Sequence, residues 1–158
     1  MQKKLKVIHI IGVVMFFGSI LGHAIAGVVS AASNDPSVFN IVRQVIEVET
    51  RYLTLPGLII FALSGVAMIV VGKIPVSRIR WLALHIVIGV LVILNAFIVL
   101  IPIGDELLQA SLQLVDGSVS FEQIGELKNK EAIFGAFNIV ACFVLITIAV
   151  IKPKFGNQ

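Results

Sequence analysis

The chain has 158 residues, of which 58% are hydrophobic and only 13% are charged. Soluble domains carry about 45–50% apolar and roughly 25% charged residues, so this chain has too few polar side chains to cover a water-exposed surface. The composition excludes a soluble enzyme, a disordered chain and a nucleic-acid-binding domain, and the net charge of +3 needs no nucleic-acid partner. The single cysteine, Cys142, excludes an internal disulfide and a multi-cysteine metal site. These features predict a small integral membrane protein.

Four apolar stretches are long enough to cross a bilayer, which takes about 20 residues of helix. They cover residues of about 5–32, 53–71, 79–103 and 132–151. Each must be helical, because an unpaired backbone amide in lipid costs several kcal/mol. We therefore expect one all-α domain over residues 1–158, an integral membrane four-helix bundle that runs up, down, up and down. Lysines precede the first stretch as in a signal peptide, but its apolar run is too long and three more follow, so we interpret it as a retained helix.

The charged residues are distributed unevenly among the segments that join the spans. The N-terminus, the turn between the second and third spans and the tail hold basic residues and no carboxylate, whereas the other two loops hold all nine carboxylates. Because positively charged loops stay in the cytoplasm, we expect a multi-pass protein of the bacterial cytoplasmic (inner) membrane with both termini cytoplasmic. The basic residues on that side are Lys3, Lys4, Lys6, Lys73, Arg78, Arg80, Lys152 and Lys154.

The first outer loop contains a helix signal. Asn34-Asp35-Pro36 is typical of a helix cap with proline at the first helical position. The apolar residues that follow recur at helical spacing, and Glu47 lies four residues from both Arg43 and Arg51, which allows ion pairs along the helix surface. We expect an outward extension of the second helix, bent or broken near Pro56.

The second outer loop contains two further helix signals. The acidic run Gly104-Asp105-Glu106 suits a helix start. Asp116-Gly117-Ser118 predicts a turn, and Ser120-Phe121-Glu122-Gln123 fits a capping box from which a helix runs into the fourth span. We interpret the outer segments of both loops as amphipathic and as a lid over the bundle.

Ionisable residues inside a span are costly and point to a function. His9 lies three residues inside Lys6 and His85 five residues inside Arg80, on helices that run in the same direction. Their depths therefore match, and helices at opposite corners of a square bundle lie roughly 11–14 Å apart. This gap suits a haem whose iron is held by one imidazole from each side.

Two glycines lie on the same helix faces as these histidines. Gly12 follows His9 by three residues, and Gly89 follows His85 by four. Each would leave room for a flat ring beside the imidazole. The alternative is that the glycines allow close helix packing and that each histidine is a neutral imidazole hydrogen-bonded across the bundle.

His23 lies fourteen residues after His9 and on the same helix face, about 21 Å further along the axis. A second haem there would need another histidine near the outer end of a different helix, and the sequence has none. We expect His23 to hydrogen-bond toward Arg51 or Tyr52, or to carry protons. Hydrogen bonds between helices are also expected from four other polar residues of the spans: Ser19, Ser64, Asn95 and Asn138.

Four short motifs lie between the first span and the end of the third. They are Leu5–Gly12 with its Lys6-x-x-His9 pattern, Arg51 followed by Pro56–Gly65, Trp81–His85, and Ile101–Glu106. Together they resemble a bacterial superfamily of small four-span proteins that includes copper-resistance D-type proteins, the J-type protoporphyrinogen IX oxidase and an uncharacterised family of predicted integral membrane proteins. The resemblance is closest to the uncharacterised family.

The resemblance to the oxidase implies that haem binds through the first-helix histidine, which is His9 here. The sequence departs from the oxidase at His85, because the oxidase has an essential lysine four residues after the tryptophan matched by Trp81. This departure is compatible with ligation by two histidines and leaves porphyrinogen oxidation as an alternative.

The leading hypothesis is a membrane protein with haem b that transfers electrons, with His9 and His85 as metal ligands. One alternative is a cofactor-free accessory or assembly protein, whose outer segments contact another membrane protein or a second copy of the chain. Copper handling is a further alternative that rests on the resemblance alone, since the sequence has no Met-rich or Cys-rich path. No nucleophile–base pair is evident, so the sequence does not decide whether the protein is an enzyme.

Overall fold

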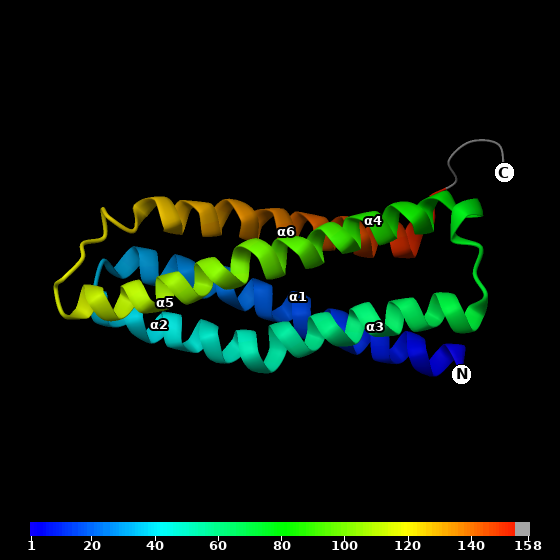
Figure 1. The fold of residues 1–158 in the computed structure, drawn as a ribbon, viewed down its shortest axis with the longest axis horizontal. Coiled ribbons are helices and arrows are strands. Elements are labelled where there is room, and N and C mark those ends of the chain that lie inside the picture. Colours follow the sequence, from blue (N-terminus) through cyan, green and yellow to red (C-terminus); the bar gives the residue numbers. More distant parts are fainter. Residues whose placement is uncertain (154–158) are drawn as a thin grey trace.

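The computed structural model describes residues 1–153, which form helices and turns with no strand among them. Four long rods lie side by side in an elongated bundle (Figure 1). The helices are α1 (Gln2–Ser33), α2 (Pro36–Glu49), α3 (Leu55–Gly72), α4 (Arg80–Asn95), α5 (Ile101–Val115) and α6 (Gly125–Ile151), with a short 3₁₀ turn, η2 (Val76–Arg78). Lys154, predicted to belong to the basic tail, lies outside the described residues.

Two of the rods are made of two helices each, joined by a π-helical segment. η1 (Thr50–Thr54) joins α2 to α3, and η3 (Ala96–Leu100) joins α4 to α5. A proline, Pro56 or Pro102, follows two residues after each π segment. Proline lacks an N–H group and its ring clashes with the carbonyl of the preceding turn, and a local π turn keeps the helix continuous there. The irregularity expected near Pro56 is therefore confirmed.

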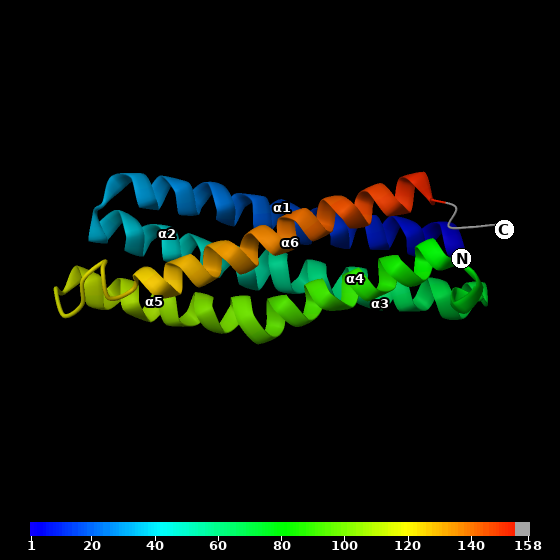
Figure 2. The same cartoon turned by 90° about the horizontal axis from the view of Figure 1, so that it is seen from above.

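The rods are antiparallel neighbours around a square. α1 packs against α2 and α3, α2 against α5, α6 against α4 and α5, and α1 against α6. The first and third rods consequently occupy opposite corners, as Figure 2 also shows. The expected all-α bundle, with its rods running up, down, up and down, is confirmed.

The bundle has two ends that differ in the segments they carry. The start of α1, the turn between α3 and α4 and the end of α6 lie at one end (Figure 1). We call the half near this end the terminal half (residues 2–17, 55–95 and 139–151) and the other half the distal half (residues 18–54 and 96–138).

The outer surface of the rods is apolar. Val14, Leu63, Val87 and Val140 are all more than half exposed, and they belong to four different rods. All four rods are long and apolar enough to cross a membrane. Exposed side chains of this kind need lipid around them, so a bilayer is the environment of the bundle.

The terminal half contains a very close approach of two helices. A Cβ atom added to Gly12 on α1 would lie 2.5 Å from the backbone nitrogen of Phe61 on α3, and one added to Gly57 would lie 2.6 Å from the nitrogen of Phe16. Only glycine permits this crossing, because the two backbones are in direct contact. Phe16 packs beside it in a core cluster that also contains Leu58, Val92 and Cys142.

The distal half is held together by a second core between α2 and α5. Phe39, Leu107 and Leu114 are buried there, and Asn40 Nδ2 donates to Ser111 Oγ at 2.9 Å. The predicted extension of the second helix is confirmed, with Pro36 as its first residue. The Asp35 side chain caps it by accepting a hydrogen bond from the Ser37 amide at 2.8 Å.

The second outer segment differs from its prediction at two points. No new helix starts at Gly104, because the third rod continues through η3 and Pro102 into α5. The last helix begins at Gly125 rather than at Ser120: Gln123 Oε1 does accept from the Ser120 amide at 2.7 Å, but the residues between form a turn. The predicted turn at 116–118 is confirmed, with Gly117 at a φ of +78°.

Candidate functional site

His9 is held against the next rod by its own hydrogen bonds. Its Nδ1 lies 2.8 Å from the Phe61 carbonyl oxygen and 3.2 Å from Ser64 Oγ, both on α3. The Phe61 ring meets the imidazole edge-on at 6.2 Å between centroids. A histidine that donates one ring N–H to a carbonyl has its tautomer and ring orientation fixed, and its other nitrogen remains available as a ligand.

His85 lies on α4, at the opposite corner of the bundle from His9. Its side chain is half-buried in the terminal half of the bundle. The Nδ1 atom of His85 is buried and has no hydrogen-bond partner within residues 1–153. The structure thus places the two histidines on rods at opposite corners of the bundle and leaves a ring nitrogen of His85 without a partner among the described residues.

The two glycines flanking these histidines have different surroundings. The space beside Gly12 is occupied by the backbone of α3, so the room predicted there for a flat ring does not exist. A Cβ atom on Gly89 would meet nothing within 4 Å, so this position is open. Gly65 is a further small residue beside the pair, since its added Cβ would lie 3.4 Å from His9 Cε1.

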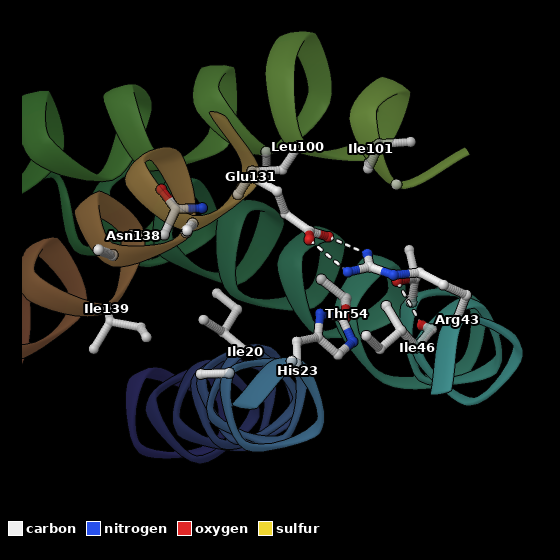
Figure 3. A pocket seen from close by; sticks show the side chains of 18 of the residues that line it. Ile20, His23, Arg43, Ile46, Thr54, Leu100, Ile101, Glu131, Asn138 and Ile139 are labelled. Carbon is white, nitrogen blue, oxygen red and sulfur yellow. Dashed lines mark hydrogen bonds and ion pairs between the residues drawn. The ribbon is translucent and has the colours of Figure 1, made fainter. Parts of the chain in front are cut away.

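A cavity of about 460 Å³ lies in the distal half, between all four rods. Most of its lining is apolar, and the polar side chains His23, Arg43, Glu131, Thr54 and Asn138 also line it (Figure 3). Both π segments contribute to its wall as well. Breaks of this kind in helix geometry are frequent at functional sites.

Arg43 crosses the bundle to α6. Its guanidinium makes a bidentate ion pair with Glu131, with nitrogen–oxygen distances of 2.5 and 2.7 Å. The side chain of Arg43 is only 3% exposed, and its charge also lies over the ring of Phe39 at 5.0 Å. Glu47, expected to pair with both Arg43 and Arg51, pairs with Arg51.

His23 faces the cavity and contacts Glu49 on α2. The distance between His23 Nε2 and Glu49 Oε2 is 3.3 Å, and both atoms are buried. The predicted partners lie elsewhere: Tyr52 is 71% exposed, and the Arg51 side chain is 70% exposed and bound to Glu47. The prediction that His23 hydrogen-bonds toward Arg51 or Tyr52 is therefore wrong, because η1 turns those two residues outward.

A polar pair closes the cavity toward the terminal half. Asn95 Nδ2 donates to Asn138 Oδ1 at 2.8 Å and to the Phe134 carbonyl at 3.0 Å. Ser19 and Thr54 share a hydrogen bond of 2.8 Å on the other side. The hydrogen bonds predicted between helices for Ser19, Ser64, Asn95 and Asn138 are confirmed.

The ion pair between Arg43 and Glu131 was missed by sequence reasoning. A signal for Arg43 exists, since it lies on the same helical face as Phe39 and Ile46, which are both buried. A charge on an apolar face requires a partner. The partner itself, 88 residues away, has no local signal. Within residues 1–153, no group of three or more histidine, cysteine or carboxylate side chains is placed to hold a metal ion.

A family model described as "Predicted integral membrane protein (DUF2269)" matches residues 3–153. No curated protein matches the chain, and no solved structure does.

Proposed function

We propose that this chain, which belongs to the DUF2269 family of predicted integral membrane proteins, binds haem b between His9 and His85 and transfers electrons in the membrane. The observation that carries the proposal is the buried Nδ1 atom of His85, which has no hydrogen-bond partner within the described chain. His9 and His85 belong to rods at opposite corners of the bundle.

The surroundings of His9 support its role as a ligand. The Phe61 carbonyl accepts the Nδ1 proton, which orients the ring and leaves Nε2 as the atom that would bind iron. Bound haem would supply a one-electron redox centre. Gly65 and Gly89 are the small residues that would make room for it, whereas Gly12 serves the crossing of α1 and α3.

We further propose that both termini face the cytoplasm of a bacterial cell and that the protein resides in the cytoplasmic membrane. The proposal rests on the basic residues that gather at the terminal end of the bundle and on the carboxylates of the outer segments. Cysteine-labelling of Ser118→Cys and Lys3→Cys variants in intact cells tests it. Labelling of the first and protection of the second is expected, and the reverse pattern would contradict the orientation.

The absorption spectrum of the detergent-purified protein, oxidised and then reduced, tests haem binding. We expect a Soret band and the spectrum of low-spin haem after expression in haem-replete cells. His9→Ala and His85→Ala should each abolish or change this spectrum, whereas the matched control His23→Ala, in the distal half, should leave it unchanged. A colourless wild-type protein rejects the proposal, and an unchanged spectrum in either ligand variant rejects that ligand.

A second candidate is a cofactor-free accessory protein that contacts another membrane protein. It is favoured by the hydrogen bonds of His9 to Phe61 and Ser64, which suffice for a neutral structural imidazole. This candidate predicts a colourless protein in which His9→Asn, able to keep a bond to the carbonyl, retains the stability of the wild type.

A further inference from the structure

The cavity of the distal half has the size and composition of a small-molecule site. Its volume of about 460 Å³ falls in the range of about 300–1,000 Å³ that is usual for such sites. Small residues of α1 and α6, among them Ala24, Gly27 and Gly135, leave the space that larger side chains would fill. Neither His9 nor His85 lines it, so the cavity is separate from the proposed haem site.

Two deeply buried donors at the cavity have no acceptor within residues 1–153. Asn138 is 0% exposed and its Nδ2 is unpaired, although its Oδ1 accepts from Asn95. Arg43 is 4% exposed, and its Nε is unpaired while the rest of the guanidinium binds Glu131. Both side chains line the cavity from different rods (Figure 3). Buried donors without acceptors cost free energy, so a ligand with oxygen acceptors would be stabilised here.

The charges around the cavity argue against an anionic ligand. Three carboxylates line it, from Glu47, Asp105 and Glu131, against two cations, from Arg43 and Lys128. The Arg43 charge is already neutralised by Glu131. Glu47 is likewise paired with Arg51, which leaves one charge of each sign, on Asp105 and Lys128. An anion would therefore meet no surplus of positive charge, whereas a neutral acceptor needs none.

We propose that the cavity binds a neutral, largely apolar molecule that carries carbonyl oxygens, with a quinone ring on an apolar tail as an example of the class. Asn138 Nδ2 and Arg43 Nε donate to the carbonyl oxygens, and the apolar walls contact the ring and the tail. His23 lines the same cavity and presents a further polar group.

Calorimetric titration of the full-length protein in detergent with three probes tests the proposal. Decyl benzoquinone is neutral and has carbonyl acceptors, decylbenzene has the apolar body alone, and decanoate is an anion. We expect saturable binding of decyl benzoquinone, at least about tenfold tighter than that of either other probe. If decylbenzene binds as tightly as decyl benzoquinone, the two donors have no role in binding. If decanoate binds more tightly than decyl benzoquinone, the ligand is not a neutral molecule. Either result would overturn the proposal. Absence of binding by all three overturns the site and leaves a water-filled cavity.

Amino-acid substitutions test whether decyl benzoquinone binds in this cavity. Gly135→Leu fills open space in the cavity wall, where an added Cβ meets nothing within 4 Å, and should abolish binding. The matched control Gly18→Leu introduces the same side chain at an open glycine outside the lining and should leave the affinity unchanged. Asn138→Leu removes one donor and should weaken binding about fivefold to tenfold. Circular dichroism of each variant confirms that it is folded, and full binding by folded Gly135→Leu would overturn the assignment.

Two further titrations distinguish a free small molecule from a lipid and the cavity from the haem site. A lipid ester has carbonyl acceptors too, so phosphatidylcholine is added as a competitor; we expect no displacement, and displacement would make a lipid the occupant and overturn a free small molecule. His9→Ala should bind decyl benzoquinone like the wild type. Failure of the haem proposal would therefore leave this result intact, and loss of binding in His9→Ala would overturn the independence of the two sites.

Discussion

The two halves of the bundle join their helices by different means. In the terminal half, α1 and α3 touch through backbone at Gly12 and Gly57, and apolar side chains fill the rest. In the distal half the rods are linked by the ion pair between Arg43 and Glu131 and by polar contacts around a cavity. The close contact at Gly12 and Gly57 leaves no space between α1 and α3 at that crossing, whereas long polar side chains of the distal half span a gap between rods. This difference is consistent with a cavity between the rods in the distal half.

The largest expected effect comes from breaking the ion pair of the distal half. Glu131→Gln leaves the buried guanidinium of Arg43 without its counter-charge and should lower the free energy of unfolding by about 3–5 kcal/mol. Denaturant titration in detergent, followed by circular dichroism, measures the change. The matched control is Glu47→Gln, which breaks the exposed pair with Arg51 and should cost less than about 1 kcal/mol. Equal losses of unfolding free energy in the two variants would contradict the expectation that the buried ion pair contributes more to stability than the exposed one.

The crossing in the terminal half should be the next most sensitive feature. Gly12→Ala places a Cβ atom 2.5 Å from the Phe61 nitrogen, so the helices must separate, and we expect a loss of about 1–3 kcal/mol. Gly18→Ala is the matched control on the same helix. Gly18 has open space around it, so its replacement by alanine should stabilise the helix by about 0.5–1 kcal/mol. The same titration reports both values, and a stabilised Gly12→Ala would show that the two backbones are not in contact.

The features that could be predicted from the sequence are those set by local signals, whereas those set by packing between rods could not be predicted. Apolar length and charge asymmetry act locally, so they located the four rods and the cap at Asp35. Helix continuity past Ile103 was missed, because the acidic run Gly104-Asp105-Glu106 is typical of a helix start. Packing of α5 on α2 supports the continuous helix.

In the candidate sites, too, helix topology could be predicted from the sequence, whereas contacts between distant side chains could not. The placement of His9 and His85 on rods at opposite corners was predicted from helix topology and is observed, whereas their joint ligation of haem stays a prediction. The pairs of His23 with Glu49 and of Arg43 with Glu131 join residues of different rods that are distant in the sequence, so no local pattern identifies them. Arg51 and Tyr52 were predicted as partners of His23 from their place at the outer end of the second helix, but they lie within η1 and are exposed.

The boundary between the halves offers a smaller test. Asn95→Leu removes the hydrogen bonds to Asn138 and Phe134, and hydrogen bonds between membrane helices contribute about 0.6 kcal/mol on average and about 1.7 at most. A double-mutant cycle with Asn138→Leu isolates the pair, and we expect a coupling energy within that range. A coupling energy of zero would mean that the amides are satisfied separately and that the pair does not join the halves.

The smallest effect is expected in the loop that connects α5 to α6, outside the spans. Ser118 donates to the Asp116 carboxylate from its hydroxyl and from its amide at 2.9 Å, and these bonds hold the pKa of Asp116 below its ordinary value of 3.8. They stabilise the turn while the carboxylate is charged, so their contribution is present above the ordinary pKa and is lost as the pH falls through the lowered one. Ser118→Ala removes the hydroxyl bond and should raise the pKa of Asp116 toward 3.8, with the global stability unchanged because the turn is exposed. Carboxyl chemical shifts in an NMR titration measure the midpoint, with Ser120→Ala as the control, and an unshifted midpoint in Ser118→Ala would assign the lowered pKa to the amide bond alone.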